Sequence, residues 1–168
     1  AAFSKITTSH PSLLNSVNTS VDATAVPDNL SGIRTMFLSL HHFSPQLATS
    51  ILSDAVSANT PIAIFEAQER NIEHVIRFSL SPLMVLLLTP FIRPLSFQRL
   101  IFTYLIPIVP LIVGWDGVVS VLRTYTPEEM LQLSADADSL NKFSWKTETI
   151  THGQQKIQVL TGRPNHLS

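Results

Sequence analysis

The sequence has no cysteine and only five glycines among its 168 residues. Without cysteine the chain forms no disulfide framework and offers no thiolate to a metal ion, which fits a reducing compartment such as the cytoplasm. Charged residues are also few, at 14%, and they sum to a formal charge of -1 at pH 7. A chain with so little excess charge has no broad field that attracts nucleic acid, so we expect no nucleic-acid partner.

The chain has the length of one domain, and 45% of its residues are hydrophobic, which is enough for a single buried core. Residues 1–5 contain no positive region followed by an apolar run, so they do not resemble a secretory signal. The first residue is also not methionine. We therefore expect residues 1–168 to form one domain that is part of a longer protein.

Short strand patterns alternate with a helical pattern in the first part of the chain. Residues 15–21 are β-tolerant and alternate with polar positions, which predicts a strand and its exit loop. Residues 33–40 are rich in isoleucine, phenylalanine, methionine and leucine, which predicts a buried strand. Ser44 and Pro45 favour the start of a helix, and apolar residues at helical spacing continue it to about Asn59.

A second strand pattern, residues 62–66, follows this helix, and strand, helix and strand in succession predict a right-handed crossover between parallel strands. Thr126, followed by proline and then by Glu129, is typical of a capped helix start. Residues 143–150 and 156–161 alternate in the strand manner and predict an antiparallel hairpin at the C-terminus. The fold class is therefore α/β.

The segment 78–122 is unusually apolar, because Arg93, Arg99 and Asp116 are its only charged residues. A membrane span needs about 20 consecutive apolar residues, and the uncharged stretches here are shorter or contain proline. We expect two short, kinked apolar helices that form an insertion packed on the domain or dipping into a membrane surface. A true membrane span is the alternative.

The order of these patterns resembles that of class I S-adenosylmethionine-dependent methyltransferases over most of the chain. The resemblance depends on Asp22-Ala23-Thr24-Ala25-Val26-Pro27, on His41-His42-Phe43 after the second strand, and on the final hairpin, which is similar to the reversed last strand of that fold. It implies S-adenosylmethionine as the cofactor, with Asp22 bonded to the adenine amino group and the Ala23 backbone to the ring. The alternative is that Asp22 simply begins a turn.

The chain departs from this family in its glycines. Such enzymes hold the methionine moiety with a first strand, a glycine-rich turn and a helix. None of the five glycines, at positions 32, 114, 117, 153 and 162, forms a Gly-x-Gly turn after an N-terminal strand. We therefore expect an incomplete Rossmann-like methyltransferase sheet that is inactive alone. Its bare edges would invite self-association, or completion of the sheet by another chain.

Candidate site residues follow the strands or lie beside the apolar insertion. His41, His42 and Glu66 come at strand ends, where the crevice of an open α/β sheet binds ligands, and Glu66 would orient a nucleophile or act as a base. The alternative for Glu66 is that it is simply a solvated residue at the end of a strand. Adjacent residues on a strand point to opposite faces, so the histidines do not predict a shared metal, and a structural histidine is the alternative. Trp115 and Tyr125 are candidates to line a pocket for a hydrophobic small molecule.

Asp116 and Arg123 have a simpler interpretation, because an ion pair between them would hold the insertion in place. The resemblance implies a methyltransferase, and the apolar insertion favours a hydrophobic small molecule as its substrate. The alternative is a non-enzymatic, membrane-associated protein anchored by residues 78–122. Cofactor binding distinguishes the two.

Overall fold

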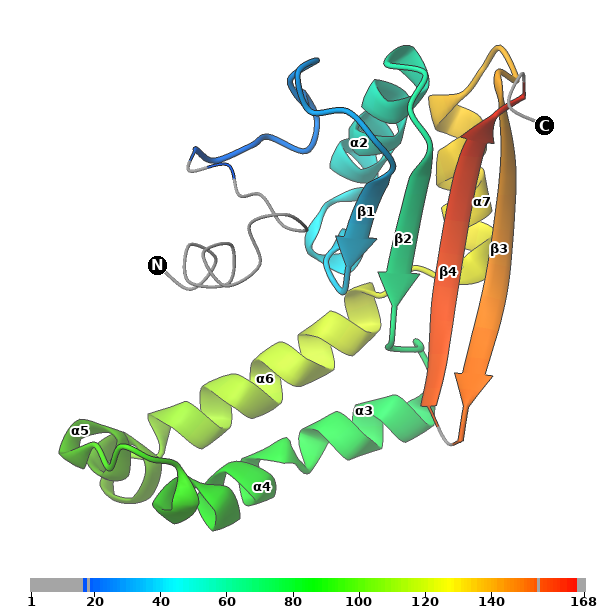
Figure 1. The fold of residues 1–168 in the computed structure, drawn as a ribbon. Coiled ribbons are helices and arrows are strands. Elements are labelled where there is room, and N and C mark those ends of the chain that lie inside the picture. Colours follow the sequence, from blue (N-terminus) through cyan, green and yellow to red (C-terminus); the bar gives the residue numbers. More distant parts are fainter. Residues whose placement is uncertain (1–16, 18, 154, 166–168) are drawn as a thin grey trace.

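The computed structural model describes residues 17, 19–153 and 155–165. Figure 1 shows a sheet with helices on one face and a long helical arm that extends away from it. The elements along the chain are β1 (Arg34–Phe37), the 3-10 turn η1 (Leu40–His42), α2 (Pro45–Ser57), β2 (Ile62–Glu66), α3 (Ile72–Ser79), α4 (Ser81–Leu88), the 3-10 turn η2 (Thr89–Phe91), α5 (Phe97–Leu100), the π-helical turn η3 (Ile101–Leu105), α6 (Ile108–Arg123), α7 (Pro127–Ala137), β3 (Phe143–His152) and β4 (Gln155–Pro164).

The sheet has four strands in the order β1-β2-β4-β3. β1 and β2 are parallel, with Arg34 opposite Ile62, and α2 connects them. β4 runs antiparallel to β2 and also to β3, so Leu160 lies opposite both Ile64 and Thr147. The predicted α/β class, the parallel pair of strands and the C-terminal hairpin are confirmed. The parallel pair and the hairpin form one continuous sheet.

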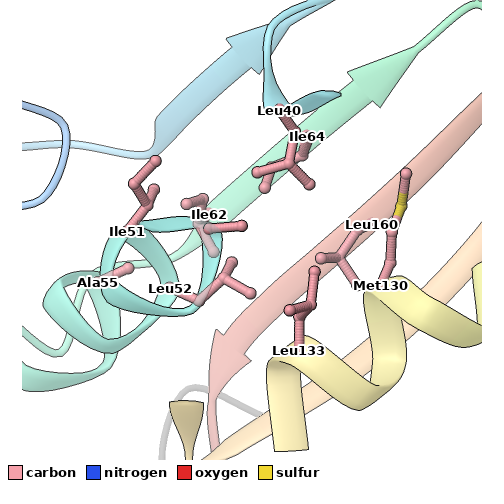
Figure 2. Close-up of a cluster of buried hydrophobic side chains, with 10 residues drawn as sticks. Leu40, Ile51, Leu52, Ala55, Ile62, Ile64, Met130, Leu133 and Leu160 are labelled. Carbon is pink, nitrogen blue, oxygen red and sulfur yellow. The ribbon is translucent and has the colours of Figure 1, made fainter. Parts of the chain in front are cut away.

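The hydrophobic core lies between the sheet and the two helices α2 and α7, which cover the same face (Figure 1). Apolar residues at helical spacing on α2 meet the alternate residues of β2 that point to this face. Figure 2 shows this cluster, which contains Leu40, Ala48, Ile51, Leu52, Ala55, Ile62, Ile64, Met130, Leu133 and Leu160. Each large side chain buried here contributes about 1.5–3 kcal/mol.

Both predicted helix starts are confirmed by their caps. The Ser44 side chain accepts a hydrogen bond from the Leu47 amide, and Pro45 occupies the first turn of α2. Thr126 and Glu129 form a reciprocal capping box at the start of α7. These local bonds satisfy amides that the first turn of a helix leaves unpaired.

The predicted buried strand at residues 33–40 is wrong in length and in burial. β1 ends at Phe37 because Leu38 turns the chain with a φ of 50°, and the next residues form η1. Within the described residues β1 is an edge strand, and its Phe37 is 64% exposed although it stacks on Phe65. Apolar composition therefore reflected β-propensity here, not burial on both faces.

The strand predicted at residues 15–21 is not observed in the positions that the structure describes. Val17 and residues 19–21 lie in neither helix nor strand, while residues 15, 16 and 18 lie outside the described part. Asp22 therefore does not follow a strand.

The arm is longer than the predicted insertion, since its helices begin at Ile72 and end at Arg123. Residues Ile72–Phe91 form one helix that is long and apolar enough to cross a membrane, and helices 97–105 and 108–123 form a second stretch bent by 74°. Packing on the domain is not observed, because the arm projects from the sheet and exposes most of its large apolar side chains (Figure 1).

Candidate functional site

A buried carboxylate fastens the turn after β1 to the end of β2. Glu66 is the last residue of β2 and is 0% exposed. Its Oε1 accepts hydrogen bonds from the amides of Leu40, at 2.7 Å, and His41, at 3.4 Å. Its Oε2 lies 2.8 Å from Nδ1 of His41, a residue that is 5% exposed. Glu66 is therefore not a solvated strand end, and it holds the histidine in place.

The contact with Glu66 fixes the chemistry of the His41 ring. An ionised carboxylate only accepts hydrogen bonds, so it favours the tautomer in which Nδ1 of His41 carries the proton. Nε2 is then the ring nitrogen left to accept a proton or a hydrogen bond from a ligand. A histidine oriented in this way by a carboxylate is an arrangement suited to general base catalysis.

His42 lies against His41, with ring centroids 4.2 Å apart at an interplanar angle of 38°. The predicted geometry, with the rings on opposite faces of a strand, is wrong because both residues lie in the turn η1. Across residues 17, 19–153 and 155–165, no group of three or more His, Asp or Glu side chains is placed to hold a metal ion.

A cavity of about 600 Å³ opens beside these histidines, between the C-terminal ends of the parallel strands and the base of the arm. The turn η1 and the start of α2 form one wall, and the end of α6 with the segment that follows forms the other. Its volume is that of a small-molecule site. The lining residues are His41, His42, Phe43, Ser44, Pro45, Leu47, Arg70, Leu122, Arg123, Tyr125 and Glu129.

Tyr125 joins the two walls of the cavity, because its hydroxyl donates a hydrogen bond of 2.8 Å to the Phe43 carbonyl. Burial, together with the negative charge of Glu129, raises the pKa of Tyr125 above its ordinary value. The hydroxyl therefore stays protonated at neutral pH and remains a donor.

Arg70 and Glu129 form an ion pair at the rim of the cavity, with Nη2 and Oε1 2.6 Å apart. The bond from Arg70, and then the bond from the Thr126 amide, lower the pKa of Glu129. Arg123 is exposed and has no hydrogen-bond or ion-pair partner among the described residues. The cavity thus offers an anionic group of a ligand one unpaired cation.

The structure brings together His41, His42 and Tyr125, with Glu66 behind them. Arg70 and Glu129 were not predicted as site residues. Glu129 was recognised only as a helix cap, and the sequence carries no signal that Arg70, 59 positions away, meets it.

Asp22 and Ala23 lie away from this cavity. The Asp22 carboxylate accepts bonds from the amide and hydroxyl of Thr24, which is the turn that was its alternative interpretation. Four residues later the Val26 amide bonds Asp54, the partner of Arg34 at the N-terminal end of β1. This segment is therefore at the opposite end of the parallel strands from His41.

Trp115 and the pair Asp116–Arg123 also differ from expectation. Trp115 is 74% exposed on the outer surface of the arm and does not line the cavity. Among the ion pairs of the described residues, none joins Asp116 to Arg123. Both lie on α6, seven positions apart, and helical neighbours that form ion pairs are three or four apart.

Comparison of the chain with protein-family models, with curated proteins and with solved structures found no match. A carboxylate-held histidine, a protonated tyrosine and an unpaired arginine around a cavity with both polar and apolar lining can bind a small molecule and accept a proton from it.

Proposed function

We propose that this chain is the C-terminal portion of a class I S-adenosylmethionine-dependent methyltransferase, and that the cavity beside His41 holds a hydrophobic methyl acceptor. The observation that carries the proposal is the order of the sheet. Two parallel strands joined by α2 are followed by a hairpin whose last strand, β4, is inserted between β2 and β3 and reversed against both. A reversed last strand is one of the features by which the sequence resembles this family.

The position of the cavity supports the same function. Ligands of open α/β sheets bind beyond the carboxyl ends of the parallel strands, and η1 and Glu66 lie at those ends. His41, oriented by Glu66, takes a proton from the acceptor atom in the proposed reaction, and general base catalysis of this kind contributes about 10²–10⁴ in rate. Leu47, Phe43 and Leu122 supply apolar contact for the acceptor.

S-adenosylmethionine, when bound, supplies the methyl group, but its two expected contacts do not lie beside the His41 cavity. Asp22 and Ala23, its expected contacts, lie at the other end of the strands, and Asp22 bonds Thr24. We therefore assign the acceptor side of the reaction to this chain. We expect the chain to bind S-adenosylmethionine weakly or not at all in calorimetric titration. A micromolar constant, about 8 kcal/mol, would overturn that assignment.

Methyl transfer from radiolabelled S-adenosylmethionine into an apolar cell extract tests the function, using the protein expressed from its natural reading frame. The wild type should transfer label, and His41→Ala should reduce transfer by about a hundredfold. His152→Ala, at an exposed histidine of the hairpin, is the matched control and should be unchanged. Absence of labelled product with the wild type would reject the proposed methyltransferase activity. Full activity of His41→Ala would reject His41 as the general base.

The second candidate, a non-enzymatic membrane-associated protein anchored by residues 78–122, is favoured by the exposed apolar arm. It predicts no methyl transfer under any condition of this assay. It also predicts that the cavity is dispensable, so that His41→Ala and His152→Ala behave alike in cells.

A further inference from the structure

The arm presents apolar side chains to its surroundings. On a soluble amphipathic helix the outward face is polar and the inward face apolar. Here α4 and α6 pack against each other, and both outward faces are also apolar. The exposed large side chains of the arm include Leu80, Leu83, Met84, Leu87, Leu88, Phe91, Leu111 and Ile112. Water is a poor solvent for such a surface.

Charges bound this apolar surface at two levels. Residues 78–92 and 100–115, the uncharged belt, contain no Asp, Glu, Lys or Arg. Arg93 and Arg99 lie beyond the belt at the tip of the arm, between η2 and η3. Arg77 and Asp116 lie next to the other end of the belt, nearer the domain. The two residues are at the same level along the arm, because Gly117 of α6 packs against Phe78 of α3.

The belt matches the thickness of a bilayer. At 1.5 Å per residue, residues 78–92 extend about 22 Å. Arginine side chains such as Arg77 and Arg93 reach several Å further toward water or phosphate. The length of the belt and the reach of the arginines at its two ends together therefore cover a hydrocarbon core of about 30 Å.

The arm supplies its own partners for carbonyl groups at its bends. The Tyr104 hydroxyl donates a hydrogen bond of 2.5 Å to the Leu86 carbonyl. At the tip, Nη2 of Arg99 donates bonds of 2.7 Å to the carbonyls of Ile92 and Pro94. Water satisfies such groups on a soluble surface, whereas in hydrocarbon they have to be satisfied within the protein.

Two glycines of α6 allow the helices of the arm to pack closely. A Cβ on Gly114 would lie 2.6 Å from the Pro82 ring, and one on Gly117 would lie 2.8 Å from the Phe78 ring. Glycine within a helix costs about 1 kcal/mol relative to alanine, so these positions are explained by the packing. Small residues at helix contacts are typical of helix pairs in membranes, where the hydrophobic effect does not hold helices together.

We propose that the arm, Ile72–Arg123, inserts into a lipid bilayer as a helical hairpin. The uncharged belt lies in the hydrocarbon, and Arg93, exposed and unpaired among the described residues, meets lipid phosphates on the far side. Trp115 and Asp116 lie at the near surface, a level that indole favours. A protein partner would cover one side of the arm, whereas a bilayer covers both apolar faces.

The prolines that argued against a span in the sequence do not interrupt a helical element in the structure. Pro82 is in the first turn of α4, at the junction with α3 inside the long helix, and Pro90 belongs to η2 at the end of that helix. Pro107 caps α6. Asp116 directly follows the uncharged belt and is not at the bilayer centre, where a carboxylate is costly.

Flotation tests the proposal, using vesicles of phosphatidylcholine with a minority of phosphatidylglycerol. The wild type should float with the vesicles. Leu87→Glu/Ile112→Glu places two charges in the belt and should reduce flotation at least about tenfold. Both side chains are exposed in the free protein, so folding should persist, as checked by circular dichroism. Ile33→Glu/Leu140→Glu adds the same charges to exposed apolar positions of the domain and should float normally.

The depth of insertion is tested with single cysteines, because the chain has none of its own. Leu95→Cys places a thiol at the tip, and Leu140→Cys places one on the domain. When protein is added to sealed vesicles, an impermeant maleimide should label the Leu140→Cys variant directly and the Leu95→Cys variant only after detergent opens the vesicles. Equal labelling of both, or a wild type that does not float, would overturn the proposal.

This inference is independent of methyl transfer. His41→Ala should lose enzymatic labelling and still float, whereas Leu87→Glu/Ile112→Glu should lose flotation with the His41 cavity intact. Failure of either proposal is therefore recognisable by itself.

Discussion

Glu66 and His41 connect the ends of two parallel strands through a contact of 2.8 Å between Oε2 and Nδ1. Both side chains are almost completely buried. The same carboxylate also accepts the amide of Leu40, so one side chain sets the path of the turn and the orientation of the imidazole. Stability and proton transfer at this site should therefore respond differently to different replacements of Glu66.

Glu66→Ala should destabilise the fold by about 3 kcal/mol or more, because it leaves the Leu40 amide and the His41 ring buried without their partner. The midpoint of urea unfolding measures this change. Glu148→Ala, which removes an exposed carboxylate paired with Lys146, is the control and should cost under about 1 kcal/mol. Equal midpoints for the two variants would contradict the structural role of Glu66.

Glu66→Gln should fold with a smaller loss, about 1 kcal/mol, and should nevertheless lower methyl transfer strongly. The amide keeps an oxygen for the Leu40 N–H but presents its NH₂ to Nδ1 of His41, which favours the tautomer with the proton on Nε2. A protonated Nε2 cannot accept a proton from the acceptor. The measurement is the proposed methyl transfer into the apolar extract by the protein expressed from its natural reading frame, and unchanged transfer with normal stability would show that Glu66 only supports the fold.

Glu129 should make stability depend on pH. Its folded pKa is lowered below the ordinary 4.5, mainly by Arg70, so its stabilising effect is present above that value and is lost as the pH falls through the folded pKa. The pair is partly exposed, so the effect is below about 1 kcal/mol. The melting temperature of Glu129→Gln should therefore lie below that of the wild type at neutral pH and approach it in acid.

Glu128→Gln is the control for this measurement, since Glu128 has no hydrogen-bond or ion-pair partner in the described residues. It should follow the wild type across the pH range. A constant difference between the wild type and Glu129→Gln would show that the Arg70 pair contributes nothing.

Local signals explain which parts of the fold were predictable. Ser44 before Pro45, and Thr126 with Glu129, determine helix starts through bonds within one turn, so the sequence reveals them. The edge position of β1 depends on which strands lie beside it, and apolar residues such as Phe37 do not encode that. Sequence patterns therefore predicted the helices and strands themselves better than they predicted which strands lie side by side.

The site was predictable to the extent that topology alone placed its residues. His41 and Glu66 follow parallel strands, and strand ends share one edge of a sheet, so their proximity could be expected. Their direct bond depends on the turn η1, which apolar periodicity does not reveal. Asp22 was assigned by resemblance alone, although Thr24, two residues later, favours a local turn.

Gly162→Ala should destabilise the hairpin by about 1–3 kcal/mol, because an added Cβ would overlap the Trp145 indole across the strand pair. Trp145 packs against the core and bonds Asp138, so the ring cannot move without loss. Thermal unfolding of Gly162→Ala, Trp145→Leu and the double variant measures the coupling. Additive effects would show that the ring does not set the requirement for glycine.

Thr35→Pro should reduce self-association of the chain, which we propose occurs through the open edge of β1. The Arg34 amide donates to the carbonyl of Pro61, just before β2, and the Leu38 amide donates to the carbonyl of Phe65 in β2. Alternation along the strand therefore directs the Thr35 amide away from the sheet. Proline there removes an outward donor without breaking a bond of the ladder, and edge strands tolerate it.

Light scattering over a range of concentrations measures the association in detergent, which covers the arm. The wild type should form dimers or larger species and Thr35→Pro should remain monomeric. Thr147→Pro on β3, the other edge, is the comparison and should still associate. Unchanged association of Thr35→Pro would locate the contact elsewhere than β1.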